Sequence, residues 1–85
     1  MAKIVVYTTS LCPYCHRAKE LLRSKGTDFE EIDIGDCSVQ RAAMREKAHG
    51  RNTVPQIWID ETHVGGFADL RALEREGKLD VLLAV

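Results

Sequence analysis

Cys12 and Cys15 are the two residues of this sequence whose type and spacing most clearly suggest chemistry. They are separated by Pro13 and Tyr14, and they lie between a short apolar run and a segment with helical periodicity. Two thiols three positions apart at the start of a helix can close a small disulfide ring, and a helix N-terminus stabilises a sulfur anion. The C-x-x-C spacing therefore predicts reversible thiol–disulfide chemistry.

The two thiols have different expected roles. Only a thiolate attacks a disulfide. Cys12 comes at or just before the helix start, where free backbone N–H groups and the helix dipole stabilise an anion. Cys15 lies one turn further into the helix, so we expect it to be more buried and less ionised. We therefore predict Cys12 as the nucleophile and Cys15 as the resolving thiol.

Other patterns compete for the same cysteines. A buried pair without redox chemistry would not require a helix start with a proline between the thiols. Together with His16 the string reads C-x-x-C-H, which is typical of covalent haem attachment, but that modification needs export and no export signal is seen. A structural zinc site would need a second ligand pair at standard spacing, and none completes the set. The sequence therefore predicts no bound metal.

The elements that must position these thiols alternate between strand and helix patterns. Strands are expected at Lys3 to Thr8, Asp28 to Ile34, Gln56 to Ile59 and Thr62 to Val64, with a turn at Asp60-Glu61. Helices are expected at Pro13 to about Lys25, Ser38 to Ala48 and Ala68 to Glu76, with a last short piece around Leu79 to Leu83. This order makes the first two strands parallel and the last two antiparallel. We expect an α/β protein with a four-stranded mixed sheet, helices on both faces and a single domain over residues 1–85.

The second predicted helix has an expected cap and an expected inward face. Asp36 or Ser38 is expected to cap its start, because both have side chains that bond to free N–H groups. The helical period places Val39, Ala42 and Ala43 on the inward face. In the third helix, the same reasoning places leucines on the core side.

Charge and cysteine content exclude several classes of protein. The net charge is −1, which predicts neither nucleic-acid nor membrane binding, although basic residues cluster from Arg41 to Arg51. The apolar run before Thr8 is too short for a signal peptide or a membrane span, so the cytoplasm is the expected location. Three cysteines are too few for a disulfide scaffold.

Two further strings predict a binding groove. Val54 precedes Pro55 and is therefore held extended, so its backbone N–H and C=O can pair with an extended ligand. The string from Gly65 to Asp69 begins a helix, whose N-terminus binds carboxylates, and Asp69 can accept from an ammonium group. Together these features fit a short peptide with a thiol at its centre and an α-amino acid at one end, which describes glutathione.

The strings CPYCHRAK, TVPQIWID and GGFADL resemble those of the glutaredoxins of the dithiol CPYC type, and the resemblance spans nearly the whole chain. It implies a thioredoxin fold with Pro55 in the cis form. It implies a glutathione-dependent oxidoreductase that reduces protein disulfides and glutathione mixed disulfides through Cys12 and Cys15. Glutathione would then be a co-substrate rather than a permanently bound cofactor, and the partners of this monomer would be glutathionylated or disulfide-containing proteins.

The resemblance also implies which residues hold glutathione: Tyr14, Thr53, Val54, Pro55, Gly66, Phe67 and Asp69. Family members often carry a lysine shortly before the first cysteine, where this chain has Thr9 and Ser10. We expect Arg41, in the second helix, to supply the missing positive charge at this site. Ala68 stands where many relatives have a hydroxyl or carboxylate side chain, so only the backbone of Ala68 can contribute to glutathione binding. Trp58 is expected in the core.

Two alternative functions and one further thiol complete the predictions. Some glutaredoxins bind an iron–sulfur cluster between two protomers, but Pro13 argues against this because cluster-binding members usually have a small residue or Ser in this motif. A thioredoxin-like reductant of a specific enzyme is the other alternative, but the Trp-rich thioredoxin motif is absent. Cys37 is expected to be an incidental surface thiol, with regulatory glutathionylation or an intermolecular disulfide as its alternative.

Overall fold

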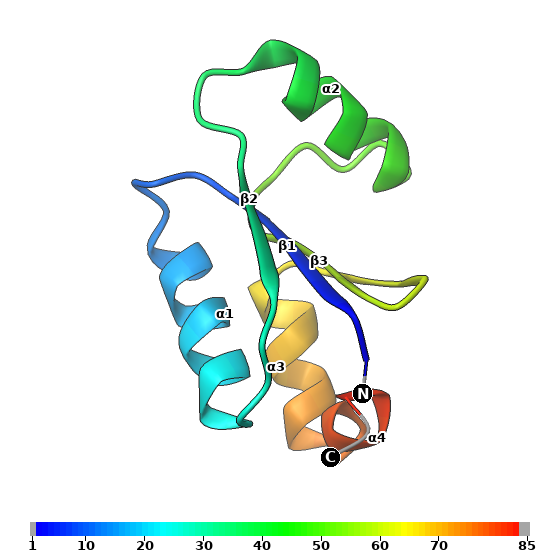
Figure 1. The fold of residues 1–85 in the computed structure, drawn as a ribbon. Helices are drawn as coiled ribbons and strands as arrows, with labels where there is room; N and C mark the ends of the chain where they lie inside the picture. The colour runs from blue at the N-terminus through cyan, green and yellow to red at the C-terminus, as the bar shows by residue number, and fades with distance from the viewer. Residues whose placement is uncertain (1, 84–85) are drawn as a thin grey trace.

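A four-stranded sheet organises the chain, whose residues 2–83 are described in a computed structural model (Figure 1). The elements are β1 (Ile4–Thr8), α1 (Pro13–Ser24), β2 (Glu30–Asp33), α2 (Ser38–Lys47), β3 (Gln56–Ile59), β4 (Thr62–Gly65), α3 (Phe67–Arg75) and α4 (Leu79–Leu83). The strand order is β2-β1-β3-β4, with β1 and β2 parallel and both other pairs antiparallel. The predicted mixed sheet is therefore confirmed. No described helix combines the length and the apolar character needed to cross a membrane.

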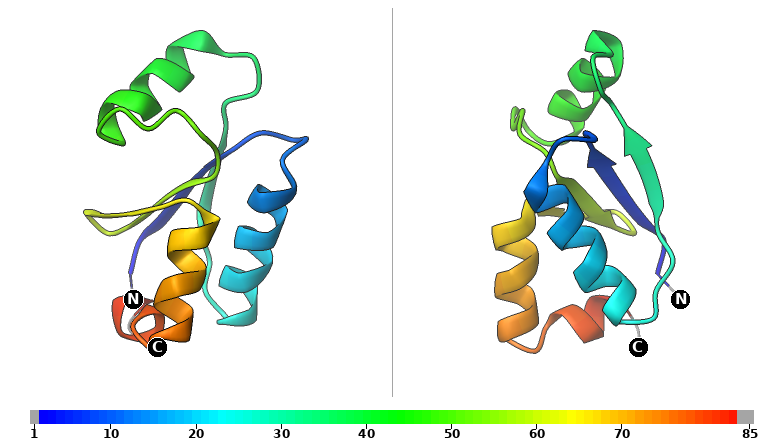
Figure 2. Two further views of the ribbon diagram at one scale, coloured as in Figure 1. Left: turned by 180° about the vertical axis from the view of Figure 1, so that it is seen from behind. Right: turned by 90° about the vertical axis from the view of Figure 1, so that its left-hand side faces the viewer.

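Helices cover both faces of the sheet, and each face has its own core. Figures 1 and 2 show α1 and α3 side by side, with α2 apart from them. The larger core joins α1, α3 and α4 to the sheet through Ile4, Val6, Ala18, Leu22, Ile57, Ile59, Leu70, Leu79 and Leu83. The smaller core, beneath α2, is formed by Ile34, Met44, Ala48 and Trp58. Every residue of β3 is buried, as expected for a strand covered on both faces. The prediction that Trp58 packs in a core is confirmed.

Helix α1 is attached to the sheet by packing and by one carboxylate. Ala18 and Leu22 of α1 are fully buried against the strands. Glu31 of β2 accepts hydrogen bonds from Lys19 Nζ at 2.8 Å and from Thr8 Oγ1 at 2.7 Å. These two donors, Lys19 above all, hold the pKa of Glu31 below its ordinary value. The contacts fix α1 next to the ends of β1 and β2, and so fix the place of the cysteines.

The hairpin between β3 and β4 forms at the predicted turn. Asp60 has a φ of 54°, a conformation that Asp adopts more readily than most residues. Its N–H donates to the carbonyl of Lys3 at 2.7 Å, and its Oδ1 accepts the N–H of Lys3 at 2.9 Å. The observed limits of all eight elements differ from the predicted ones by about two residues at most. The largest difference is in β2, which is shorter than predicted.

The predicted inward face of α2 is wrong. Val39 is 77% exposed, and Ala42 and Ala43 are also exposed. Met44 and Ala48 are buried instead, against Trp58 and its neighbours. The helix is rotated about its axis relative to the prediction, because the long, flexible side chain of Met44 fills the space beside the Trp58 indole better than alanine does.

The predicted cap of α2 is also wrong. Cys37, not Asp36 or Ser38, is the N-cap residue, and its side chain makes no capping hydrogen bond. The reason is the position of the first helical bond, in which the N–H of Arg41 donates to the carbonyl of Cys37 at 3.0 Å. Cys37 is exposed, as expected for a surface thiol.

Replacing Met44 by alanine is expected to lower the free energy of unfolding by about 2–5 kcal/mol, because a fully buried side chain leaves a cavity. The change Val39→Ala is the control, since an exposed position on the same helix is expected to change stability by no more than about 0.5 kcal/mol. Urea unfolding followed by circular dichroism measures both. A larger loss for Val39→Ala would show that α2 packs as first predicted.

Candidate active site

The start of α1 holds both cysteines of the C-x-x-C string. Cys12 is the N-cap residue in an extended conformation, and Pro13 follows in the first turn, where a missing N–H costs nothing. The Sγ atom of Cys12 accepts the backbone N–H of Cys15 at 3.2 Å. Sulfur thus occupies the position that a Ser, Thr or Asp oxygen takes at other helix starts. A negative charge on this sulfur is stabilised both by that N–H and by the helix dipole.

Val54 lies next to the Cys12 sulfur although it is far away in sequence. The Cys12 thiol lies 3.6 Å from the carbonyl oxygen of Val54 and can donate to it. The Val54–Pro55 peptide bond is cis, as the family resemblance implies. The backbone N–H of Val54 has no hydrogen-bond partner among residues 2–83. An extended peptide beside Cys12 can therefore pair with this backbone.

Cys15 differs from Cys12 as expected. Cys15 is fully buried, whereas Cys12 is partly exposed. Burial, and then the hydrogen bond with the Cys12 side chain, raise the pKa of Cys15 to about 12. The expectation that Cys15 is the more buried and less ionised thiol is confirmed. Its role as the resolving thiol stays a prediction.

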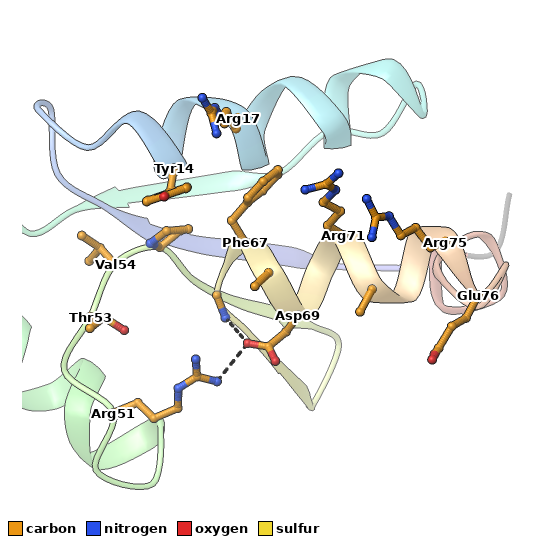
Figure 3. Close-up of a pocket in the computed structure, with 14 residues that line it drawn as sticks. Tyr14, Arg17, Arg51, Thr53, Val54, Phe67, Asp69, Arg71, Arg75 and Glu76 are labelled. Atoms are coloured by element: carbon orange, nitrogen blue, oxygen red, sulfur yellow. Dashed lines mark hydrogen bonds and ion pairs between the residues drawn. The ribbon is translucent and has the colours of Figure 1, made fainter.

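A groove of about 800 Å³ lies beside Val54 and along α3 (Figure 3). Seven of the eight residues predicted to bind the co-substrate line this groove: Tyr14, Thr53, Val54, Pro55, Gly66, Phe67 and Asp69. The rings of Tyr14 and Phe67 stack with their centroids 6.2 Å apart. The groove therefore has an apolar part close to the thiols and polar groups at the start of α3.

Arg41, the eighth predicted residue, does not line the groove. Its Nη1 donates to the carbonyl oxygen of Asn52 at 2.7 Å, and so it supports the loop that leads to Thr53. Its assignment as the positive charge of the binding site stays a prediction.

Arg51 lines the groove but was not predicted from the sequence. Its Nη1 lies 3.1 Å from Asp69 Oδ2, which also accepts the N–H of Gly66 at 2.9 Å (Figure 3). Burial opposes the charged form of Asp69, but these two donors outweigh it and the pKa of Asp69 is lower than usual. The basic cluster that ends at Arg51 was a signal for this contact, without indicating which residue makes it. Three more arginines of the groove, Arg17, Arg71 and Arg75, were also not predicted.

Gly65 leaves the space in which the side chains of Arg51 and Asp69 form their contact. Its φ is 111°, which residues with a side chain rarely adopt. A Cβ atom at this position would overlap the guanidinium of Arg51 and the carboxylate of Asp69. The pair therefore depends on glycine at position 65.

Both the sequence and the fold of this chain are similar to those of known proteins. Residues 4–64 match a family model described as Glutaredoxin. The chain is 60% identical over 84 residues to a Pseudomonas aeruginosa protein named Glutaredoxin, with 99% of each chain covered. It resembles the solution structure of glutaredoxin from Brucella melitensis, with 55% identity, a TM-score of 0.86 and coverage of 98% of this chain and 89% of that one. It also resembles a crystal structure of a buckwheat glutaredoxin–glutathione complex, with 30% identity, a TM-score of 0.86 and coverage of 98% and 77%.

A mixed four-stranded sheet with a dithiol at the start of its first helix defines a thiol–disulfide oxidoreductase with the thioredoxin fold. The family match covers most of the chain, and the relatives match over nearly all of it. The chain belongs to the glutaredoxin family.

Alkylation of the reduced protein over a pH series is expected to modify Cys12 long before Cys15. Two pH units below a pKa of about 12, only about one per cent of Cys15 is thiolate, and burial further limits access. Peptide mass spectrometry measures each thiol, and exposed Cys37 serves as the internal control. Equal labelling of Cys12 and Cys15 near neutral pH would contradict this difference.

The change Arg51→Gln is expected to raise the pKa of Asp69, because it removes a positive charge and a donor that favour the carboxylate. The rise should be partial, since the N–H of Gly66 still donates to Asp69. NMR titration of the side-chain carboxyl measures the shift. Arg71→Gln is the matched control, because Arg71 lines the same groove without bonding to Asp69. An equal shift in both variants would mean that the direct contact is unimportant.

Proposed function

We propose that this glutaredoxin uses glutathione to reduce protein disulfides and glutathione mixed disulfides. The observation that carries the proposal is the position of the Cys12 thiol, 3.6 Å from the Val54 carbonyl oxygen. The thiol lies next to a groove in which the guanidinium of Arg51 contacts the carboxylate of Asp69. Glutathione has a thiol at its centre and an α-amino acid at one end, so each of its reactive groups has a counterpart here.

The charged pair Arg51–Asp69 matches the γ-glutamyl end of glutathione. The carboxylate of Asp69 can accept from the ammonium group, and the guanidinium of Arg51 can donate to the α-carboxylate. The N-terminus of α3, at Gly66 and Phe67, adds backbone N–H groups that favour an anion. Both side chains are about half exposed, so an incoming zwitterion can replace each one's present partner.

The middle of glutathione matches the backbone of Val54 and the apolar rings beside it. Val54 offers an N–H and a C=O to an extended peptide, as in strand addition. Tyr14, which is 56% exposed, and Phe67 provide apolar contact. The buckwheat glutaredoxin whose structure resembles this one was crystallised in complex with glutathione, which supports the proposal.

Reduction of a glutathione mixed disulfide needs only Cys12. The Cys12 thiolate forms a bond to the glutathione sulfur, and the protein sulfur leaves as a thiolate. A second glutathione thiolate then bonds to the glutathione sulfur on Cys12. This step frees the Cys12 thiolate and yields oxidised glutathione. Glutathione is therefore a co-substrate in this reaction, and the reducing cytoplasm is the compartment in which the cycle can continue.

Reduction of a protein disulfide uses Cys15 as well. Cys12 first forms a mixed disulfide with one substrate sulfur, and the other leaves as a thiolate. The Cys15 sulfur then loses its proton and bonds to the Cys12 sulfur, and the substrate sulfur that was bound to Cys12 leaves as a thiolate. Two glutathione molecules reduce the resulting Cys12–Cys15 disulfide. The pKa of Cys15 is raised partly by the Cys12 side chain, and a Cys12 in a mixed disulfide no longer carries a negative charge, so Cys15 ionises more easily at the step that needs it.

The two alternative functions have less support. Within residues 2–83, no group of three or more His, Cys, Asp and Glu side chains is placed to hold a metal ion. An iron–sulfur cluster would therefore need ligands from outside the chain. A thioredoxin-like reductant does not require the adjacent guanidinium and carboxylate that Arg51 and Asp69 present in this groove.

Two cysteine variants test the proposal in a glutathione-coupled assay. Cys12→Ser is expected to lose all activity, because the nucleophile is gone. Cys15→Ser is expected to keep the reduction of glutathione mixed disulfides, which needs one thiol, and to lose most reduction of protein disulfides. Equal residual activity in the two variants would contradict the assigned roles.

The choice of reductant is tested with the wild-type protein. Glutathione with glutathione reductase is expected to sustain turnover, and thioredoxin reductase is expected not to. The reverse result would favour the thioredoxin-like alternative.

A further inference from the structure

The groove extends beyond the residues proposed to hold glutathione. Those on α3 lie in its first turn, at Phe67 and Asp69, whereas Arg71 and Arg75 also line the groove. From Phe67 to Arg75 the helix axis rises about 12 Å. Glutathione held at the first turn therefore leaves about one and a half further turns of α3 free to contact a larger substrate.

The far part of the groove has a basic wall, formed by Arg17, Arg71 and Arg75. Figure 3 shows Arg71 and Arg75 next to each other on α3 beyond Phe67, with Arg17 on α1. Among residues 2–83, none of the three arginines forms an ion pair. All three residues are exposed, and each guanidinium group can donate to a carboxylate.

The two acidic residues that line the groove, Asp69 and Glu76, are each paired with a cation outside this wall. Asp69 is paired with Arg51 at 3.1 Å, and Glu76 with Lys78 at 3.4 Å. The acid Glu74 of α3 pairs with Lys25 at 2.6 Å. The whole chain has a net charge of −1, so the basic wall does not result from an overall excess of positive charge.

We propose that the basic wall binds acidic side chains that flank the reacting cysteine of protein-disulfide substrates. The proposal relies on the disulfide reduction proposed above and adds the class of substrate that the enzyme prefers. Arg17 lies about 8 Å along α1 from Cys12, and an extended chain advances about 3.3–3.6 Å per residue. Acidic residues about two to six positions from the reacting cysteine can therefore reach the wall.

The expected effect acts mainly on the rate of productive encounter. Each exposed carboxylate–guanidinium contact contributes little by itself, and charges outside a buried interface chiefly increase the association rate. Such contacts weaken as salt screens them. The preference for acidic substrates should therefore be a change in kcat/KM that decreases at high ionic strength.

A set of cyclic disulfide peptides tests the proposal. The peptides share one disulfide ring and differ only in flanking residues, which are Glu, Gln or Lys on either side. Reduced enzyme is mixed with each peptide without glutathione, and the initial rate of appearance of peptide thiols is measured. The Glu peptides are expected to react about three- to tenfold faster than the Lys peptides at low salt. Equal rates for all peptides in the wild type would overturn the proposal.

Two double variants with the same change in net charge test whether the preference for Glu peptides depends on the basic wall. R71E/R75E is expected to abolish or reverse the preference. K3E/R45E is the matched control, because Lys3 and Arg45 are exposed, form no ion pair among residues 2–83 and lie outside the groove. This control is expected to keep the preference. An equal loss in both would mean that net charge, and not the groove, selects the substrate.

A second assay separates this proposal from the proposed function. Glutathione-coupled reduction of a small uncharged disulfide, hydroxyethyl disulfide, measured at high ionic strength where charge effects on glutathione are screened, is expected to be the same in R71E/R75E as in the wild type. Its failure in the wild type with the peptide preference intact would contradict glutathione dependence and leave the basic wall supported. Normal turnover of the small disulfide without any peptide preference would contradict the basic wall alone.

Discussion

The hydrogen bond from the Cys15 N–H to the Cys12 sulfur is the interaction around which this site is built. It makes the reactive atom part of the helix itself, because the sulfur caps the first turn of α1. Any change that moved α1 would move the sulfur with it. The packing of Ala18 and Leu22 and the anchoring of α1 through Glu31 therefore also position the chemistry.

The sequence predicted the sheet and the helices well because their patterns are local. Apolar runs such as Ile4 to Tyr7, and glycine or proline at the ends of elements, are sufficient to locate strands and helices. The face of α2 could not be predicted in this way, since its apolar residues do not form a single stripe. Its rotation depends on the shape of the surface beneath it, where the indole of Trp58 leaves space for Met44 and Ala48. That shape is set by residues of other elements.

The site was predictable wherever it follows directly from one string. The thiol pair, the backbone at Val54 and the start of α3 each belong to a short motif, and the structure brings all three together. Arg51 was missed because it lies 18 positions from Asp69, within the loop between α2 and β3, whose path no local pattern specifies. The contact also requires the positive φ of Gly65, which the sequence allows but does not demand.

The carbonyl oxygen of Val54 receives the Cys12 thiol in the free protein, and a peptide paired with Val54 would use the same oxygen. A carbonyl oxygen has two lone pairs, so it can accept the Cys12 thiol and the N–H of an incoming peptide at the same time. A peptide paired at this carbonyl is therefore held by the same atom that the reactive sulfur contacts. One backbone oxygen thus fixes both where a substrate docks and where it meets the sulfur.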